Sequence, residues 1–398
     1  MRISLEEAQC LILENVTPLA PVRLPLKNAL GYVLAQDVAA GMDQPPFPRS
    51  PYDGYALRSA DSAGASETSP VTLEVVGRSF AGAPANIALG PGEAVRIMTG
   101  GVIPEGADCV VMQEHTDEGE ARVRVFEVLS PYVNFCRQGE DFRAGETLVK
   151  AGTKCTAAVA AVCASAGVTA LSVVPRPRVG LLSTGDELQK PGTKLAPGHI
   201  FDSNAAFLSA RLAELGVPAL PSGPVGDEPD LLADAVFDAA RLSDLVVTTG
   251  GVSVGQKDYL PATFARIGAV TVFHGVAMKP GMPAAFAVLD EKPLLALSGN
   301  PFASAVTFEL LGRWVLAKRA CDPTLAPTEA LGVLGQSYEK RRPCRRFLRA
   351  VLDSGAVTFP PEQQNGQMRS MIGCNCLAEL PAGDAPVAAG TPVKVFLL

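Results

Sequence analysis

An apolar run that ends in hydroxyls and glycines constrains this chain more than any other segment. It covers residues 244–255, DLVVTTGGVSVG, and Asp258 follows its last glycine by three residues. The run itself is typical of a buried strand. Glycines let a backbone approach an anion closely, and free N–H groups at the start of a helix point toward it. The segment therefore predicts a phosphate site at the end of a strand, with an acid beside it.

Composition limits the classes of protein to which the chain can belong. A length of 398 residues is too great for one core and predicts two to four domains. The formal net charge is −7 and no Lys-Arg block occurs, which disfavours a nucleic-acid partner. No apolar run reaches the roughly 18 residues of a membrane helix, and the N-terminus lacks a secretory pattern, so we expect no membrane partner.

The cysteines and histidines give no sign of a zinc site. The nine cysteines are scattered without a C-x-x-C, and the three histidines lie far apart in the sequence. Reduced thiols, and with them a cytoplasmic location, are the default expectation for such cysteine usage.

The first half of the chain predicts a β domain inserted into a small helical domain. Ser4 and Glu7 form a capping box that starts a helix over 4–15, and a second helical pattern covers 156–166. Between them, residues 71–76 and 121–126 alternate with period two, as half-buried strands do. We expect the helical domain to comprise residues 1–42 and 143–174 and the inserted β domain to comprise residues 43–142.

After a stiff Pro-Arg-Pro connector at 175–177 the pattern changes to strand-helix alternation. The predicted strands are 179–183, 245–249, 270–276 and 293–297, and the predicted helices are 204–215, 231–241 and 301–318. Such alternation predicts a doubly wound, mostly parallel α/β domain over 175–325. Short β runs at 346–352 and 393–398 predict a separate barrel-like β domain over 326–398. The expected fold class is therefore α/β and β multidomain.

Four loops of the α/β domain follow candidate strands, at residues 183–188, 248–255, 278–283 and 297–301. Each taken alone has a structural interpretation: Asp186 could cap a helix, Lys279 could be a solvated loop lysine, and 298–301 could be a plain helix start. Ligands in open α/β sheets bind at the carboxyl ends of strands. Convergence of four such loops at one edge therefore favours a ligand site.

The residue types in these loops suggest that they bind an anion such as phosphate. The acids Glu187, Asp227 and Asp258 lie on loops of the same domain. Carboxylates beside phosphates repel them unless a cation intervenes, and Mg²⁺ is the usual bridge. A G-x-x-x-x-G-K-[ST] loop and a G-x-G-x-x-G fingerprint are both absent, which disfavours a P-loop kinase and a nicotinamide dehydrogenase. No Ser-His pairing stands out for nucleophilic hydrolysis.

The inserted region has three turn-rich motifs of its own. Prolines stiffen residues 45–57 around Asp53-Gly54, a Thr-Gly-Gly turn begins at Thr99, and Asp141 closes a Gly-Glu-Asp motif. The alternative is that these are ordinary β-turns, which for Asp141 alone we favour.

Seven motifs in this order resemble the MoeA family of molybdopterin molybdenumtransferases, to which the C-terminal part of gephyrin also belongs. The motifs are residues 50–56 (SPYDGYA), 98–100 (MTG), 139–141 (GED), 184–188 (TGDEL), 250–255 (GGVSVG), 279–281 (KPG) and 298–301 (SGNP). They span nearly the whole chain.

The resemblance implies a late step of molybdenum cofactor synthesis. Family members take adenylylated molybdopterin and molybdate, hydrolyse the pyrophosphate link with the help of Mg²⁺, release AMP and leave molybdenum on the pterin dithiolene. The family forms homodimers whose cleft lies between the α/β domain of one subunit and the inserted β domain of the other. A transient contact with a molybdopterin adenylyltransferase is a further expectation.

The resemblance also implies roles for individual residues. Asp258 and Glu187 are the expected catalytic and magnesium-binding acids, with Asp227 a weaker member, while Asp53 and Asp141 would act from the partner subunit. Ser298 and the backbone after it would place molybdate at a helix start. The substrate-binding set is Thr99, Thr184, Gly185, Asp186, Gly250, Gly251, Ser253, Gly255, Lys279, Ser298, Gly299, Asn300 and Pro301.

The chain departs from many relatives at two positions. Gly275 and Met282 stand where lysines often occur, so two positive charges are missing near an anion site, and His274 and Arg49 are candidates to compensate. Three alternatives stay open: a molybdopterin adenylyltransferase, although those are usually single-domain; a non-catalytic gephyrin-like scaffold, against which the retained acids argue; and a tungsten-specific paralogue.

Overall fold

The computed structural model describes residues 2–252 and 260–398. The chain forms two compact units, which we call unit 1 (Met1–Val22 with Val173–Leu398) and unit 2 (Arg23–Ser172). Helix α1 (Leu5–Asn15), capped by Ser4 as predicted, belongs to unit 1. The sequence had grouped it with the small helical domain instead. The four domain boundaries themselves stay a prediction.

Unit 1 contains a six-stranded sheet in the order β14-β11-β15-β19-β18-β16. The strands are β14 (Ala219–Val225), β11 (Val179–Thr184), β15 (Leu245–Thr249), β19 (Lys292–Leu297), β18 (Ala285–Leu289) and β16 (Val270–His274). The first four run parallel, and β18 is antiparallel to both of its neighbours. This is the mostly parallel sheet that the sequence predicted.

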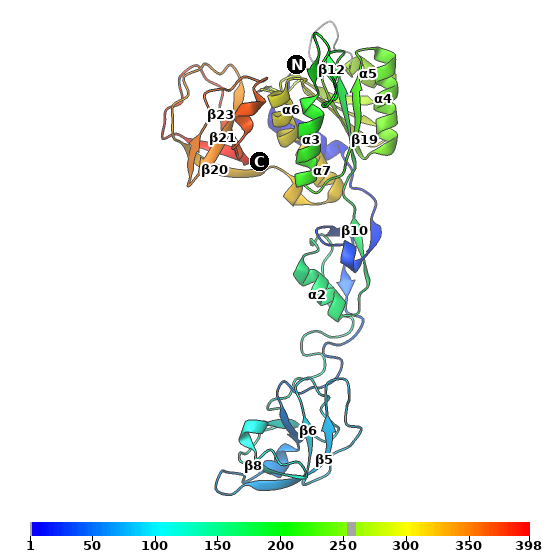
Figure 1. Ribbon diagram of the computed structural model, residues 1–398, viewed down its shortest axis with the longest axis vertical. Coiled ribbons are helices and arrows are strands. Elements are labelled where there is room, and N and C mark those ends of the chain that lie inside the picture. The colour runs from blue at the N-terminus through cyan, green and yellow to red at the C-terminus, as the bar shows by residue number, and fades with distance from the viewer. Residues whose placement is uncertain (1, 253–259) are drawn as a thin grey trace. The chain divides into compact units, whose positions relative to one another are not determined.

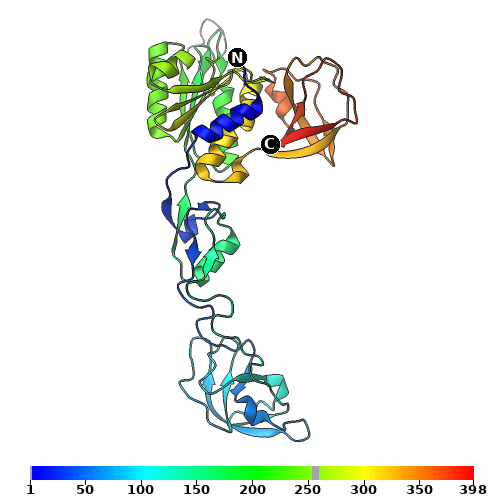
Figure 2. The same ribbon diagram turned by 180° about the vertical axis from the view of Figure 1, so that it is seen from behind.

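Helices cover both faces of this sheet (Figure 1), because successive strand residues point to opposite sides. On one face Leu181 and Val247 pack with α3 (Ser203–Glu214), α1 and the helical segment after β19. On the other face Leu182 and Val246 pack with α4 (Pro229–Leu242) and α5 (Leu260–Arg266). Figure 2 shows α1 beside α7 (Arg313–Ala320). The doubly wound prediction is thus confirmed.

The predicted helix over 301–318 is interrupted. It consists of α6 (Pro301–Thr307), a π-helical turn η4 (Phe308–Gly312) and α7. A Cβ on Gly312 would lie 2.7 Å from the ring of Phe308, so a larger residue there would force that buried ring to shift. The turn carries Glu309, whose side chain is only 2% exposed.

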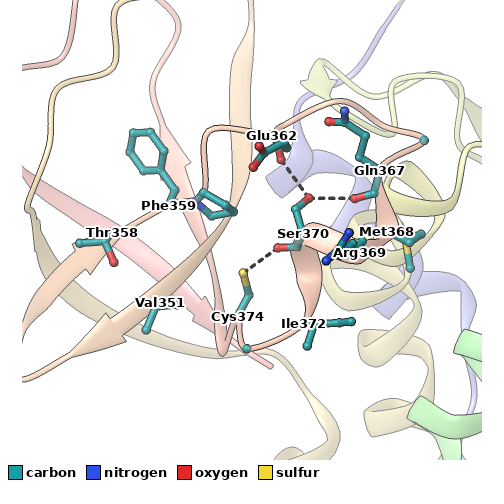
Figure 3. A pocket seen from close by; sticks show the side chains of 13 residues that line it. Val351, Thr358, Phe359, Glu362, Gln367, Met368, Arg369, Ser370, Ile372 and Cys374 are labelled. Atoms are coloured by element: carbon teal, nitrogen blue, oxygen red, sulfur yellow. Dashed lines mark hydrogen bonds between the residues drawn. The ribbon is translucent and has the colours of Figure 1, made fainter.

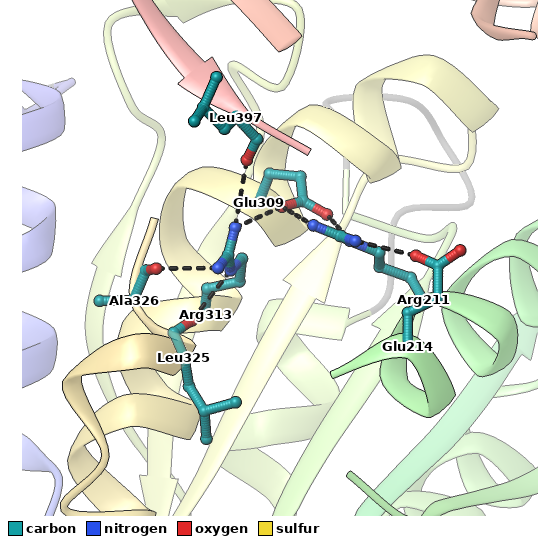
Figure 4. Close-up of polar contacts among 7 residues, drawn as sticks. All are labelled: Arg211, Glu214, Glu309, Arg313, Leu325, Ala326 and Leu397. Atoms are coloured by element: carbon teal, nitrogen blue, oxygen red, sulfur yellow. Dashed lines mark hydrogen bonds and ion pairs between the residues drawn. The ribbon is translucent and has the colours of Figure 1, made fainter. Parts of the chain in front are cut away.

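Glu309 is the centre of a buried ion-pair network (Figure 4). Arg211 of α3 donates from Nε to its Oε1 at 2.7 Å, and Arg313 of α7 donates from Nη1 to its Oε2 at 3.2 Å. Arg313 also donates to the carbonyl oxygens of Leu325 at 2.9 Å and Leu397 at 3.4 Å. The network therefore joins α3, the π turn and the last strand of the chain.

The C-terminal region is a closed five-stranded barrel, as expected for a barrel-like domain. Its strands are β20 (Thr328–Leu334), β21 (Arg345–Asp353), β22 (Ala356–Thr358), β23 (Cys376–Leu380) and β24 (Pro392–Leu397), and β21 pairs with both β22 and β23 to close the ring. Phe347, Leu377 and Phe396 of the barrel belong to the same apolar core as α1.

Unit 2 contains a five-stranded sheet in the order β7-β4-β6-β5-β8, labelled in part in Figure 1. The strands are β7 (Cys109–Met112), β4 (Gly54–Leu57), β6 (Glu93–Ile97), β5 (Val71–Ser79) and β8 (Arg122–Val125). The rest of the unit comprises α2 (Ala157–Ser165) and the short strands β1 (Val22–Pro25), β2 (Val33–Leu34), β3 (Val38–Ala39), β9 (Thr147–Val149) and β10 (Ala170–Val174). Across the described ranges, no helix is long and apolar enough to cross a membrane.

We expect Glu309→Gln to lower the free energy of unfolding of unit 1 by about 3–5 kcal/mol, because it leaves the buried guanidinium of Arg313 without its anion and Arg211 with only the exposed Glu214. Trp314, the one tryptophan of the sequence and a neighbour of Arg313 in the chain, reports urea unfolding by fluorescence. Asp238→Asn, which breaks an exposed pair with Arg241 on α4, is the control and should change stability by about 0–1 kcal/mol. Equal effects of the two variants would contradict the structural role of the network.

Candidate functional site

Three neighbouring parallel strands of unit 1 end in register. Ser183 of β11 lies opposite Thr249 of β15, and Thr249 lies opposite Leu297 of β19. The loops that follow these strands therefore leave the sheet at one edge. Carboxyl ends of parallel strands are where α/β sheets bind ligands.

The loops enclose a cavity of about 680 Å³ at this edge. Its walls also include parts of β12 (Leu188–Gln189), β13 (Ile200–Phe201) and the start of α3. Of the residues named from the sequence, it is lined by Thr184, Gly185, Glu187, Asp227, Gly250, Gly251, Ser298, Gly299, Asn300 and Pro301. The size suits a small organic ligand.

Glycine is required where two of these loops touch. Gly250 has φ +97°, and a Cβ there would lie 2.4 Å from the carbonyl oxygen of Thr184. Its own N–H donates to the carbonyl of Leu297 at 3.0 Å. The N–H of Gly250 is thus engaged within the protein, and the residue's contribution is to let the backbones approach.

Side-chain hydrogen bonds hold the loops in place. Thr184 donates from Oγ1 to the carbonyl oxygen of Thr249 at 3.3 Å. Asn204 of α3, which the sequence analysis did not single out, donates from Nδ2 to the carbonyl oxygen of Gly299 at 2.8 Å. In the sequence, an asparagine in the first turn of a predicted helix was the feature that could have pointed to it.

The acids of the cavity have distinct positions. Glu187 is exposed, and its carboxylate lies against Gly185, where a Cβ would be 2.6 Å from Oε2. Asp186 is not among the lining residues; its Oδ1 accepts the backbone N–H of Asp227 at 3.0 Å. Asp186 therefore orients the loop that brings Asp227 to the cavity.

Besides Asp186, four residues expected at the site from the α/β domain are not placed in this cavity. Lys279 is exposed on β17 (Met278–Lys279), which pairs in parallel with β21 of the barrel, and it is not among the lining residues. Ser253, Gly255 and Asp258 lie outside the described residues.

The barrel contributes a wall that the sequence did not predict. Gly366 lines the cavity, and the neighbouring Asn365 accepts the backbone N–H of Phe302 at 3.0 Å. Fully buried Arg349 holds this loop: it donates to the carbonyl of Gln364 at 2.7 Å, and its guanidinium lies 3.8 Å from the centre of the Phe302 ring. In the sequence, an arginine in the middle of an otherwise apolar strand was the feature that could have pointed to Arg349.

A second cavity of about 1050 Å³ lies on the barrel and shares Gly366 with the first (Figure 3). Phe359, Met368 and Ile372 supply much of its apolar wall. Ser370 donates to the carbonyl of Glu362 at 2.9 Å, and burial raises the pKa of the Cys374 thiol. We place the functional site in the smaller cavity because it gathers the predicted acids and glycines.

In unit 2 the structure brings Asp53 and Thr99 together. Oδ1 of Asp53 accepts the backbone N–H of Thr99 at 2.7 Å and its hydroxyl at 2.8 Å. Both bonds stabilise the ionised carboxylate and hold the pKa of Asp53 below its usual range, and the bond from the backbone of Thr99 has the larger effect. Asp141 is exposed on another loop, where its N–H donates to the carbonyl of Gln44 at 2.9 Å.

Fold and site together define a multidomain α/β protein with a polar, glycine-lined cavity at the carboxyl edge of its parallel sheet. Three family models match the chain: MoeA N-terminal region (domain I and II) over residues 3–167, probable molybdopterin binding domain over 180–318, and MoeA C-terminal region (domain IV) over 332–398. The chain belongs to the MoeA family.

Similar proteins cover almost the whole chain. A molybdopterin molybdenumtransferase of Bacillus subtilis is 38% identical over 94% of this chain and 89% of its own length. One from Staphylococcus aureus is 34% identical over 99% of this chain and 95% of its own. A crystal structure of the MoeA molybdopterin biosynthesis protein from Pyrococcus horikoshii superposes with a TM-score of 0.79 at 26% identity, covering 100% of both chains.

We expect Gly250→Ala to destabilise unit 1 more than Gly268→Ala does. Both glycines have positive φ, +97° and +81°, but a Cβ on Gly268 would meet no described atom within 4 Å. The control should therefore show only the backbone strain of about 1–2 kcal/mol. Gly250→Ala should add about 1–3 kcal/mol of overpacking against Thr184. Urea unfolding followed by Trp314 fluorescence measures both, and equal losses would show that the close contact is unimportant.

We expect Thr99→Val to raise the pKa of Asp53, since it removes the hydroxyl bond and keeps the backbone bond. A pKa lowered by folding means that these bonds stabilise unit 2 above the unfolded value of about 3.9, and that this stability is lost as pH falls through the folded value. Carboxyl-carbon NMR titration measures the shift. Thr72→Val on β5 is the control, and an unmoved Asp53 pKa in Thr99→Val would refute the assignment.

Proposed function

We propose that this protein is a molybdenum insertase that uses adenylylated molybdopterin and molybdate, releases AMP and forms molybdenum-bound molybdopterin. One observation carries the proposal: the 680 Å³ cavity gathers Glu187, Asp227 and the loops at Gly250 and Ser298. The relatives that match nearly the whole chain are named molybdopterin molybdenumtransferase. Transferase chemistry on a molybdopterin substrate is the activity that both observations support.

The glycine-lined part of the cavity would receive the phosphates of the substrate. Gly185, Gly250, Gly251 and Gly299 line this part, and the absence of their side chains lets the loops pack closely enough to form it. The hydroxyls of Thr184 and Ser298 line the same space. Molybdate would bind beside Ser298, and Lys279 would act only if its loop approached the cavity.

The donor set suits Mg²⁺ as the cation of this site. Mg²⁺ takes oxygen ligands, and one or two carboxylates with substrate phosphates suffice. Exposed Glu187 supplies one carboxylate and Asp227 a second, while Asp258 is the further expected ligand. Within residues 2–252 and 260–398, no group of three or more His, Cys, Asp or Glu side chains could hold a metal. When bound, Mg²⁺ would neutralise phosphate charge and polarise the pyrophosphate link.

The side chains would then act on the water that breaks this link. Glu187, Asp227 or Asp258 would accept the proton of the attacking water, which adds to phosphorus as the phosphate oxygen of the leaving group departs. Asp186 would keep Asp227 in position through the backbone bond described above.

We extend the proposal to a cytoplasmic homodimer in which Asp53, Thr99 and Asp141 complete the site of the other subunit. The carboxylate that Thr99 holds ionised supports a polar role for this pair. Substrate would arrive through a transient contact with a molybdopterin adenylyltransferase.

The test is molybdate-dependent AMP release from adenylylated molybdopterin in the presence of Mg²⁺. We expect wild type to release AMP and Glu187→Gln to do so about 10²–10⁴ times more slowly, the range for loss of an acid-base group. Glu228→Gln, an exposed carboxylate beside Asp227 that does not line the cavity, is the matched control and should keep wild-type activity.

Two outcomes would contradict the proposal. Absence of AMP release from wild type, where an established insertase works, would remove the insertase assignment. Adenylylation of molybdopterin with ATP instead would identify the adenylyltransferase alternative. Normal activity of Glu187→Gln would remove only the role given to that residue.

A further inference from the structure

A third cavity, of about 230 Å³, lies within the inserted β domain, and no role has been assigned above to the residues that line it. Its lining includes Tyr55, Arg78, Phe80 and Arg96, together with the turn at residues 118–120. Tyr55 on β4 lies opposite Arg96 on β6, and Arg96 lies opposite Arg78 on β5. The three side chains therefore form one row across three strands, on the same face of the sheet.

Two arginines directly opposite each other on adjacent strands repel. Glu118 lies 3.9 Å from Nη2 of Arg96, and Glu120 lies 3.6 Å from Nη2 of Arg78. Both separations exceed ordinary hydrogen-bond lengths. The two glutamates also remain largely exposed, at 62% and 86% of their side-chain surface. These contacts are therefore weak ion pairs, which offset the repulsion only in part.

Arg96 is held rigidly but incompletely satisfied. Its Nη2 donates to Oε1 of Gln113 at 2.7 Å, and its guanidinium lies 4.7 Å from the centre of the Tyr55 ring. Its Nη1 is buried and has no hydrogen-bond partner among the described residues. A buried cationic donor without an acceptor is costly and calls for an explanation.

The turn at residues 118–120 lies beside Arg96 but does not satisfy it. Tyr55 anchors it by donating its hydroxyl to the carbonyl of Gly119 at 3.0 Å, and Glu118 has φ +55°, a conformation uncommon for a residue with a side chain. The Glu118 carboxylate approaches Arg96 without a hydrogen bond. An oxyanion of better geometry would gain the charge-assisted bond from Nη1 of Arg96 that Glu118 does not make.

We propose that this cavity is a phosphate-binding site, in which the carboxylates of Glu118 and Glu120 occupy the place of the anion until it binds. Paired guanidinium groups suit a doubly charged tetrahedral anion. The volume is below the roughly 300–1000 Å³ of sites for whole organic ligands, so it accommodates one phosphate group, free or at the end of a small molecule. Arg96 also helps to lower the pKa of Asp53, but none of the residues that line this cavity has a role in the molybdenum chemistry proposed above.

The test is a fluorescence titration of the full chain carrying Phe80→Trp, which places an indole in the cavity wall. Inorganic phosphate and AMP are the probes, and acetate is the monoanionic control. Unit 1 holds the native Trp314, which gives a constant background that is subtracted with the parent protein. We expect a saturable change with phosphate, with AMP or with both, and none with acetate.

Three substitutions in this background separate the site from general charge effects. Arg78→Gln should weaken binding about 10-fold or more through loss of a charged hydrogen bond. Glu118→Gln should tighten it, because a competing carboxylate is removed, and a folding defect could not produce this direction. Arg122→Gln, an exposed arginine of the same sheet paired with Glu74 outside the cavity, should leave binding unchanged.

Response to phosphate supports a free-anion site, and a response to AMP alone that Arg78→Gln weakens supports a phosphorylated small molecule. Absence of a saturable response to both probes would overturn the proposal. Equal weakening by Arg78→Gln and Arg122→Gln, or weaker binding in Glu118→Gln, would do so as well. The titration includes no catalytic step, so its result does not depend on whether AMP release from adenylylated molybdopterin occurs.

Discussion

The site of unit 1 depends on the parallel register of β11, β15 and β19. Because Ser183, Thr249 and Leu297 lie side by side, the three loops that follow meet without long connections. Helices bury both faces of these strands. A one-residue slip of a strand would turn each of its side chains to the opposite face, and the packing of both apolar cores would be lost. The ligand cavity is therefore held by the packing of the whole α/β domain, and the loops themselves need few internal bonds.

Register alone does not close the cavity. Gly250 and Thr184 approach more closely than any side chain on residue 250 would permit. On the opposite side the barrel supplies Gly366, which Arg349 and Phe302 hold through a cation–π contact and neighbouring backbone bonds. The α/β domain and the barrel therefore share both the cavity and one apolar core.

Local patterns in the sequence were sufficient to predict the helices and strands that depend on residues nearby in the chain. The strand over 245–249 and the helix over 204–215 were predicted from periodicity alone. Pairings between distant segments were not visible: β17 joins the barrel, so Lys279 is not among the residues at the edge where its loop was expected. The burial of Arg349 and Glu309 depends likewise on partners from other elements, which no local period reveals.

Helix α1 has a consequence for how the chain is made. Its residues Leu5, Ala8 and Ile12 are buried against segments at the other end of the sequence, and Gln9 donates to the carbonyl of Leu310, 301 positions away, at 3.1 Å. During synthesis on the ribosome, this apolar face stays exposed to solvent until most of the protein, including its packing partners, has emerged. Unit 2, whose residues are contiguous, can complete its own sheet in the meantime. Unit 1 is begun before unit 2 and finished after it, so the apolar face of α1 stays exposed while unit 2 is being made.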